Sequence, residues 1–229
     1  MSEVMDISRH REVLIRAGSL RLGGELIVPD GACGVVVFAH GSGSSRFSRR
    51  NQYVARVLRE AGLGTLLFDL LTREEERLDE ATRHLRFDIP LLASRLVDAV
   101  GWLGERPEAS GKAIGLFGAS TGGAAALVAA AELGGRIGAV VTRGGRPDLA
   151  GEALRRVVSP TLLIVGGYDD AVIDFNEEAL LRLRCEKQLR IVPGATHLFE
   201  ESGKLEEVAR LATAWFARHL GAERGSGGG

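Results

Sequence analysis

Short apolar runs rich in β-branched residues alternate with segments of helical pattern along most of this 229-residue chain, and this alternation constrains the fold more than any other feature. Runs of this kind are typical of strands buried on both faces of a parallel sheet. The helical segments between them are expected to cover both faces of that sheet, which predicts an α/β fold. The predicted strands are Gly34–Ala39, Gly64–Asp69, Ala113–Phe117, Ile137–Thr142, Thr161–Val165 and Gln188–Val192.

The segments between the strands repeat apolar residues at helical spacing. In the last of them, Val208, Leu211 and Trp215 belong to one apolar face that would pack on the sheet. The predicted helices are Arg50–Ala61, Ile89–Leu103, Thr121–Leu133, Asn176–Leu183 and Lys204–His219.

The remaining segments complete the expected domain. Strand-like Glu12–Arg16 and Leu20–Val28 flank a Gly-Ser turn and predict an N-terminal antiparallel hairpin. The charged segment Leu70–Phe87 is interpreted as a solvated surface helix or loop, with a short flap over the site as the alternative. Residues 1–224 are therefore expected to form a single domain, and residues 225–229 a flexible Gly/Ser tail.

Charge and composition exclude several classes of function. Lys and Arg total 29 against 30 Asp and Glu, a formal net charge of −1, so no basic surface indicates nucleic-acid binding. No apolar run approaches the length of a membrane span, and the polar segment Met1–Arg11 is unlike a secretory signal. Cys33 and Cys185 lack metal-site spacing and are interpreted as free thiols. We therefore predict a cytoplasmic protein that contacts neither nucleic acid nor membrane and needs no metal or other cofactor.

A candidate nucleophile lies where the strand Ala113–Phe117 meets the helix Thr121–Leu133. The connecting residues Gly118–Gly122 fit the G-x-S-x-G pattern in the strand–turn–helix setting that a nucleophile elbow requires. Side chains two positions before and after the serine would collide in so tight a turn, which explains both glycines. We predict that Ser120 is the nucleophile, in a strained backbone conformation. The alternative is a glycine-rich turn that serves close packing alone.

The candidate general base is His197. In sheets with such an elbow the chain order is serine, acid, histidine, and among the five histidines only His197 follows Ser120 in a loop directly after a strand. Its role would be to take the Ser120 proton and return it to the leaving group. The alternative is a structural or exposed loop histidine.

The candidate acid follows the strand Thr161–Val165. We predict Asp169, because an aspartate with Val172 three residues on is the usual pattern after this strand in folds with such an elbow. Asp170 is interpreted as a turn or helix-cap residue. Asp69 also follows a strand but precedes the serine, so chain order makes it the weaker candidate.

A glycine-rich loop, His40–Ser45, follows the first parallel strand. Gly41 and Gly43 allow the backbone to approach a substrate oxygen and are candidate substrate-binding positions. The N–H groups of Ser42 and Thr121 are the predicted oxyanion-hole donors, with that of Gly43 as the near alternative to Ser42.

The same loop allows two further interpretations. His40 is expected to anchor the loop as a structural residue. A phosphate cradle is the rival interpretation of the loop itself, but it lacks the Gly-Lys-Ser/Thr ending of a P-loop and the G-x-G-x-x-G of a dinucleotide fold.

Arginines gather near the predicted active edge of the sheet. Arg143 or Arg146, after the strand Ile137–Thr142, could grip a substrate carboxylate, and we name Arg143 as a candidate substrate-binding residue. The favoured alternative is a surface arginine paired with a nearby acid. The loop His40–Ser45, called the oxyanion loop below, is followed by three arginines that could add to this charge: Arg46, Arg49 and Arg50.

Four motifs now stand in one order: His40-Gly41, Gly118–Gly122, Gly166–Asp169 and Gly194–His197. With them the chain resembles the α/β-hydrolase superfamily, and it looks closest to the dienelactone hydrolase-like branch, from the first hairpin to the last helix. The resemblance implies hydrolysis of small carboxylic esters through an acyl-enzyme. Dienelactone hydrolases proper use a cysteine nucleophile where this chain has Ser120, so ester hydrolysis is the implied chemistry and dienelactone itself is not.

Further functions stay open at this point. The short gaps between the motifs leave no room for a large lid domain, which implies a small, open pocket for short acyl chains. The same triad would serve a thioesterase or an acyltransferase, and the fold alone would serve a non-catalytic binding protein. The expected partner is a small-molecule ester. The apolar hairpin and last helix would also suit a homodimer, although burial within one subunit explains them equally well.

Overall fold

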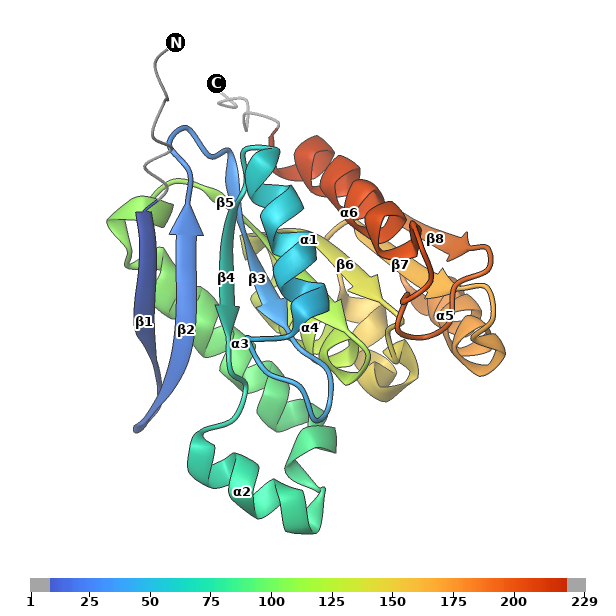
Figure 1. Ribbon diagram of the computed structural model, residues 1–229, viewed down its shortest axis with the longest axis horizontal. Helices are drawn as coiled ribbons and strands as arrows, with labels where there is room; N and C mark the ends of the chain where they lie inside the picture. Colours follow the sequence, from blue (N-terminus) through green and yellow to red (C-terminus); the bar gives the residue numbers. More distant parts are fainter. Residues whose placement is uncertain (1–8, 222–229) are drawn as a thin grey trace.

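The computed structural model describes residues 9–221, through which one eight-stranded sheet runs in the order β1-β2-β4-β3-β5-β6-β7-β8 (Figure 1). The first two strands form an antiparallel hairpin, and β2 also pairs antiparallel with β4; the other neighbours pair in parallel. The strands are β1 (Arg9–Ala17), β2 (Leu20–Val28), β3 (Gly34–Ala39), β4 (Gly64–Phe68), β5 (Ala113–Ala119), β6 (Ile137–Arg143), β7 (Thr161–Gly166) and β8 (Lys187–Val192).

Helices cover both faces of this sheet. Two of them, α1 and α6, pack on one face, while α3, α4 and α5 pack on the other (Figure 1). The helices are α1 (Arg49–Glu60), α2 (Arg73–Thr82), α3 (Ile89–Gly104), α4 (Thr121–Leu133), α5 (Asp170–Arg182) and α6 (Lys204–Leu220). Short 3₁₀ segments lie at η1 (Leu85–Phe87), η2 (Pro107–Ala109), η3 (Gly134–Arg136) and η4 (Pro147–Arg156).

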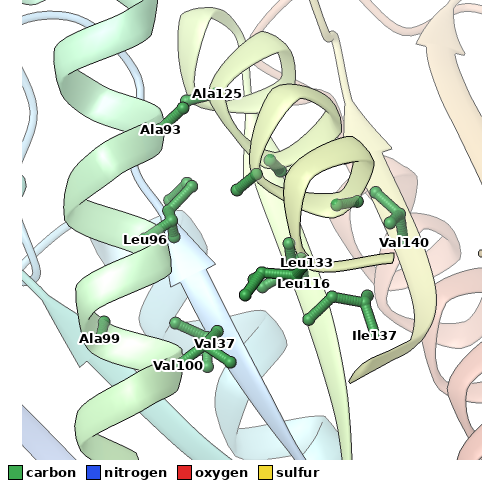
Figure 2. Packing of buried hydrophobic residues seen from close by; sticks show 14 of the residues in the cluster. Val37, Ala93, Leu96, Ala99, Val100, Leu116, Ala125, Leu133, Ile137 and Val140 are labelled. Carbon is green, nitrogen blue, oxygen red and sulfur yellow. The ribbon is translucent and has the colours of Figure 1, made fainter. Parts of the chain in front are cut away.

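Burial on both faces explains why the central strands are apolar throughout. Every residue of β3 is buried: Val36 and Phe38 pack in the core under α1 and α6, whereas Val35 and Val37 pack in the core under α3 and α4. Figure 2 shows Val37 beside Val100 of α3, inside the second of these cores. Each fully buried side chain of this size contributes about 1.5–3 kcal/mol to stability, which fixes the sheet between its two helical layers.

Small residues let α3 and α4 approach each other. Ala93 of α3 and Ala125 of α4 are buried and lie side by side in Figure 2. The close approach holds α4 against the sheet, and the first residue of α4 directly follows Ser120.

The prediction of an α/β-hydrolase fold without a large lid domain is confirmed. β3 and α4 begin and end at the predicted residues. α5 begins at Asp170 rather than Asn176, because aspartates interrupt the apolar pattern while an acidic residue in the first turn suits the start of a helix. η4 was not predicted, since Gly151, at φ 53°, divides it into two short pieces without a continuous apolar face.

The charged segment after β4 forms the surface helix α2 followed by η1. A capping box starts α2: the Thr72 hydroxyl accepts a hydrogen bond from Glu75 N–H, and the Glu75 carboxylate accepts one from Thr72 N–H. The helix ends at Thr82, and its C-cap, Arg83, adopts a left-handed conformation at φ 56°. α2 follows the carboxyl end of β4, at the edge of the sheet where the site lies (Figure 1).

Some expectations concern residues that the structure does not describe. The predicted tail, residues 225–229, lies outside the described residues, as does most of the polar segment Met1–Arg11. Between residues 9 and 221, no helix has both the length and the apolar character that crossing a bilayer requires.

Candidate active site

Ser120 lies in the turn between β5 and α4 with φ 51° and ψ −122°, a conformation that residues other than glycine rarely adopt. Hydrogen bonds to the loop after β6 hold this conformation. The Ser120 N–H donates to the Arg143 carbonyl at 3.2 Å, and the Ser120 carbonyl accepts from Arg146 N–H at 3.1 Å and Gly123 N–H at 2.9 Å. Strain at one serine within a well-bonded turn is a feature of functional sites.

The two glycines of the elbow have no room for a side chain. A methyl group on Gly118 would collide with the backbone of Gly122, and one on Gly122 would collide with the carbonyl oxygens of Ala39 and His40. The elbow is therefore pressed against the end of β3, where the oxyanion loop begins. The sequence interpretation of these glycines agrees with this geometry.

His197 and Asp169, which are 28 residues apart in the sequence, meet at the carboxyl ends of β7 and β8. The imidazole Nδ1 lies 2.6 Å from Asp169 Oδ2. Asp169 occupies the N-cap position of α5, yet its side chain forms no cap bond, so its carboxylate is free to orient the imidazole. Asp170, the first residue of α5, lies in the first helical turn, and Asp69 binds Arg46 instead.

Ser120 and His197 line one cavity of about 230 Å³. Among residues 9–221 no hydrogen bond joins the Ser120 hydroxyl to the His197 ring; in serine hydrolases such contacts commonly tighten only on substrate binding. With Nδ1 bonded to Asp169, the other ring nitrogen, Nε2, is left to accept the serine proton. The arrangement brings the three predicted triad residues together at one edge of the sheet.

Gly144 is a site residue that the sequence interpretation missed. It follows β6 with φ 51°, and a methyl group built on it would lie 3.2–3.3 Å from the carbonyl oxygen, Cε1 and Nδ1 of His197. The imidazole therefore packs directly on Gly144. A Gly-Gly pair after a strand was the available signal, but the sequence does not show which side chain covers it.

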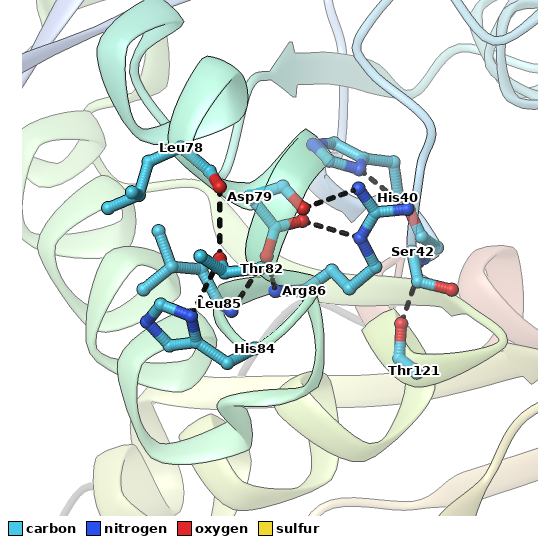
Figure 3. A network of polar contacts seen from close by, with 10 residues as sticks. His40, Ser42, Leu78, Asp79, Thr82, His84, Leu85, Arg86 and Thr121 are labelled. Atoms are coloured by element: carbon cyan, nitrogen blue, oxygen red, sulfur yellow. Dashed lines mark hydrogen bonds and ion pairs between the residues drawn. The ribbon is translucent and has the colours of Figure 1, made fainter.

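The two residues predicted to supply the oxyanion-hole donors, Ser42 and Thr121, are hydrogen-bonded to each other. The Ser42 N–H donates to the Thr121 hydroxyl at 3.0 Å, as Figure 3 shows, so this donor already has an acceptor within the protein. The Thr121 N–H, first in α4, has no acceptor within the helix. Gly43, the alternative donor, has φ 67° and lies where a methyl group would be 3.3 Å from the Arg86 guanidinium.

His40 joins the ends of β3 and β4. Its Nδ1 lies 3.0 Å from the Gly41 carbonyl, and its Nε2 accepts a hydrogen bond from Leu70 N–H at 3.0 Å. Since Nε2 is the acceptor, Nδ1 carries the proton and the ring is neutral. Burial lowers the pKa of His40 below its ordinary value near 6.5, which keeps the ring in this state.

A second cavity of about 630 Å³ shares the oxyanion-loop residues with the first and extends under α2. Asp79 of α2 and Arg86 form an ion pair in its wall, and Figure 3 shows this pair beside the oxyanion loop. Its apolar lining comes from Phe47, Leu70, Leu71 and Leu92. The α2 segment thus borders the site, although no sequence motif marked its residues as functional.

The arginines near the site differ in their partners. Arg146 forms two hydrogen bonds with the Asp148 carboxylate, at 2.9 and 2.7 Å, and is a surface arginine paired with a nearby acid. Arg46 pairs with Glu12 and Asp69. Arg143 is buried, and among the described residues it has no acidic partner.

The chain is similar to proteins of known family and known structure. The model of the dienelactone hydrolase family matches residues 22–220. The structure is similar to the crystal structure of a dienelactone hydrolase from Anabaena variabilis ATCC 29413, with 59% identity, a TM-score of 0.91, and coverage of 93% of this chain and 99% of that one. It also resembles Est1E from Butyrivibrio proteoclasticus, at 16% identity, a TM-score of 0.77, and coverage of 92% and 99%, which shows the fold alone.

Curated relatives are longer than this chain. Two proteins of Mycobacterium tuberculosis, from strains CDC 1551 / Oshkosh and ATCC 25618 / H37Rv, bear the name "Putative phosphoribosyl transferase" and are 58% identical to it over 212 residues. The matched region is 93% of this chain and 47% of each relative. The chain therefore spans about half the length of the curated relatives it matches.

Proposed function

The chain belongs to the dienelactone hydrolase family, and from this premise we propose that it is a serine hydrolase that cleaves small carboxylic esters with Ser120, His197 and Asp169 as its triad. The family supports hydrolase activity, and a serine nucleophile is typical of the fold. The observation that carries the proposal is a strained serine sharing a cavity with a histidine whose Nδ1 lies 2.6 Å from an aspartate.

The proposed reaction begins with attack of Ser120 Oγ on the ester carbonyl. His197 Nε2 takes the hydroxyl proton and delivers it to the leaving alcohol, while Asp169 stabilises the imidazolium through Nδ1. An acyl-enzyme results, and a water molecule activated by the same histidine then hydrolyses it. Each half-reaction passes through a tetrahedral intermediate with a negative oxygen.

The negative oxygen would be bound by backbone N–H groups. The Thr121 N–H lies at the start of α4, where the helix dipole adds to its effect. The Ser42 N–H would become available by leaving the Thr121 hydroxyl, to which it donates at 3.0 Å. The cavity under α2, with its apolar lining, is suited to the hydrocarbon part of an ester.

The test is hydrolysis of p-nitrophenyl esters of rising chain length, with a matched thioester, by the wild type, Ser120→Ala and Ser94→Ala. Ser94 is an exposed serine on α3 and controls for loss of a hydroxyl elsewhere. We expect Ser120→Ala to lower kcat by at least about 10³-fold and Ser94→Ala to leave it unchanged. The thioester separates an esterase from a thioesterase.

Labelling with an organophosphate, read by mass spectrometry, gives an independent measurement. The expected result is one adduct on the peptide that contains Ser120, absent in Ser120→Ala. Folded wild type that hydrolyses no ester and takes no label would overturn the proposal in favour of a binding protein.

A further inference from the structure

Asp79 is a buried carboxylate on a helix that is otherwise largely exposed. Its neighbours in α2, Leu78 and Glu80, are exposed, whereas Asp79 itself is 2% exposed. The carboxylate accepts hydrogen bonds from Leu85 N–H at 2.7 Å, from Arg86 N–H at 3.2 Å and from Arg86 Nε. Arg86 Nη2 also donates to the Asp79 carbonyl at 3.2 Å. These bonds fix the Arg86 guanidinium, and the carboxylate balances its charge.

The helix α2 is also held near its start. The Glu75 carboxylate accepts a hydrogen bond from Arg95 of α3 at 2.8 Å, and Arg95 is buried. Glu75 and Asp79 are four residues apart and therefore lie on one face of α2. Ion pairs thus join this face to α3 and to η1, and they fix the wall of the 630 Å³ cavity that Asp79 and Arg86 line.

One nitrogen of the fixed guanidinium lies against the oxyanion loop. Arg86 Nη1 has no hydrogen-bond acceptor among the described residues, and a methyl group built on Gly43 would lie 3.3 Å from it. Gly43 has φ 67°, and the turn that contains it is closed by the Ser44 N–H, which donates to the Gly41 carbonyl at 3.2 Å. Figure 3 shows the guanidinium between the Asp79 carboxylate and this loop.

The oxyanion loop is therefore enclosed on two sides. A methyl group built on Gly41 would lie 3.2 Å from Ser120 Cβ, so this end of the turn is pressed against the proposed nucleophile. At the other end, Gly43 has a similarly close contact with Arg86. Ser42, between the two glycines, supplies a predicted oxyanion-hole N–H. Contacts at both ends of the turn thus set where its N–H groups lie.

We infer that Arg86, held by Asp79, is a positioning residue that braces the oxyanion loop at Gly43. The contact keeps the loop where its backbone N–H groups can reach the negative oxygen that forms when Ser120 attacks. Arg86 touches no reacting atom and acts through the loop. Its planar fork makes this possible, because Nε and Nη2 bind Asp79 while Nη1 remains directed at the loop. The inference rests on the proposed function, which supplies the negative oxygen.

The kinetic signature follows from when that oxygen exists. It forms in both half-reactions and is absent from the ground-state ester, so a displaced loop should lower kcat and leave KM nearly unchanged. Removal of one oxyanion-hole donor lowers kcat about 10²–10³-fold, and a displaced donor is a smaller fault. We expect Arg86→Met to lower kcat on p-nitrophenyl acetate roughly tenfold, with KM within about threefold of wild type.

A trifluoromethyl ketone, 1,1,1-trifluoro-2-butanone, tests the binding of the negative oxygen directly. Ser120 Oγ adds to its carbonyl carbon, the π electron pair moves onto the carbonyl oxygen, and His197 takes the hydroxyl proton. The adduct thus carries the negative oxygen and no leaving group. We expect Arg86→Met to raise the inhibition constant by about the factor that it lowers kcat. A purely structural role would lower Tm and leave the inhibition constant of the folded enzyme unchanged, which would overturn the inference.

Arg77→Met is the matched control. Arg77 is exposed on α2 and does not line the cavity, so this variant loses the same side chain and charge without changing the contact with the loop. We expect it to keep the wild-type kcat, KM and inhibition constant.

Two further variants test the link to Asp79. Asp79→Asn should lower kcat, and Asp79→Asn/Arg86→Met should be no slower than Arg86→Met, because Asp79 acts through Arg86. Arg86→Lys keeps a charge beside Asp79 and guards against a failure to fold. Its single nitrogen cannot bind Asp79 and contact Gly43 together, so kcat should still fall. Wild-type kcat and inhibition constant in folded Arg86→Met or Arg86→Lys would overturn the inference.

Hydrogen exchange measures the bracing without ester cleavage. In Ser120→Ala protein, the Ser44 amide that closes the turn should exchange faster when Arg86→Met is added and should not change when Arg77→Met is added. Faster exchange supports the bracing contact even if wild type cleaves no ester, in which case the proposed function alone fails. Unchanged exchange, together with wild-type kcat in Arg86→Met, overturns the inference and leaves the hydrolase intact.

Discussion

Replacement of Gly144 by alanine should lower kcat. It should lower the free energy of unfolding no more than alanine does at another glycine of positive φ. The His197 ring packs on this glycine, and an added methyl group would lie 3.2–3.3 Å from its carbonyl oxygen, Cε1 and Nδ1. Such contacts are relieved only if the histidine or the loop moves by a few tenths of an ångström. The imidazole would then leave the position from which we propose that it accepts the Ser120 proton.

Gly151 provides a control with nearly the same φ. Its φ is 53° against 51° for Gly144, and a methyl group on it would meet nothing within 4 Å. An alanine at either position carries the strain of a positive φ, about 1–3 kcal/mol. A displacement of about 1 Å at a catalytic group lowers the rate about 10²-fold, so a smaller shift of His197 predicts roughly a tenfold loss of kcat for Gly144→Ala alone.

The assay pairs urea unfolding with kcat on p-nitrophenyl acetate for both variants. Unfolding free energies lowered by similar amounts, with kcat reduced only in Gly144→Ala, would agree with the reasoning. If both variants keep wild-type kcat, contact with Gly144 does not position the imidazole, and the role given to this glycine is wrong.

Two further outcomes follow from the site. Asp169→Asn should lower kcat by about 10⁴-fold, because the amide cannot stabilise the His197 imidazolium, whereas Asp170→Asn, changed only in a helical turn, should stay within about twofold in the same ester assay. His40 has a folded-state pKa below 6.5, so the unfolded chain binds more protons and stability falls as pH drops below about 6.5. Between pH 7 and pH 5 the free energy of unfolding in urea should therefore fall less for His40→Gln than for wild type. An equal fall would contradict a neutral buried ring.

Sequence reasoning reached the strands, and the placement of Ser120, Asp169 and His197 at one edge of the sheet, because their signals are local. Gly118–Gly122 lies between a buried strand and a small-residue helix, and chain order then selects His197. Strand ends in a parallel sheet meet at one edge, so residues far apart in sequence are brought together without any knowledge of side-chain contacts. The start of α5 was missed because its apolar pattern is weak before Asn176.

Side-chain contacts between segments far apart in the sequence could not be predicted in this way. The Ser42 N–H and the Thr121 hydroxyl are 79 residues apart, and no spacing rule connects them. Arg143 and Arg146 are three residues apart, yet only Arg146 has an acid within reach, in Asp148 two residues away. An aspartate nearby in the sequence predicts the partner of an arginine. That an arginine lacks an acidic partner can be seen only when all the residues around it in the structure are known.

The end of β6 and the loop after it connect Ser120 to His197. The Arg143 carbonyl accepts from the Ser120 N–H at 3.2 Å and the Arg146 N–H donates to the Ser120 carbonyl at 3.1 Å, while His197 packs on Gly144 between them. A backbone hydrogen bond contributes about 0.5–1.5 kcal/mol, so these two bonds are comparable to the roughly 1–3 kcal/mol of strain at Ser120. The strained Ser120 thus depends on the same segment that contacts His197, and a change in this segment should alter the proposed nucleophile and the proposed base together.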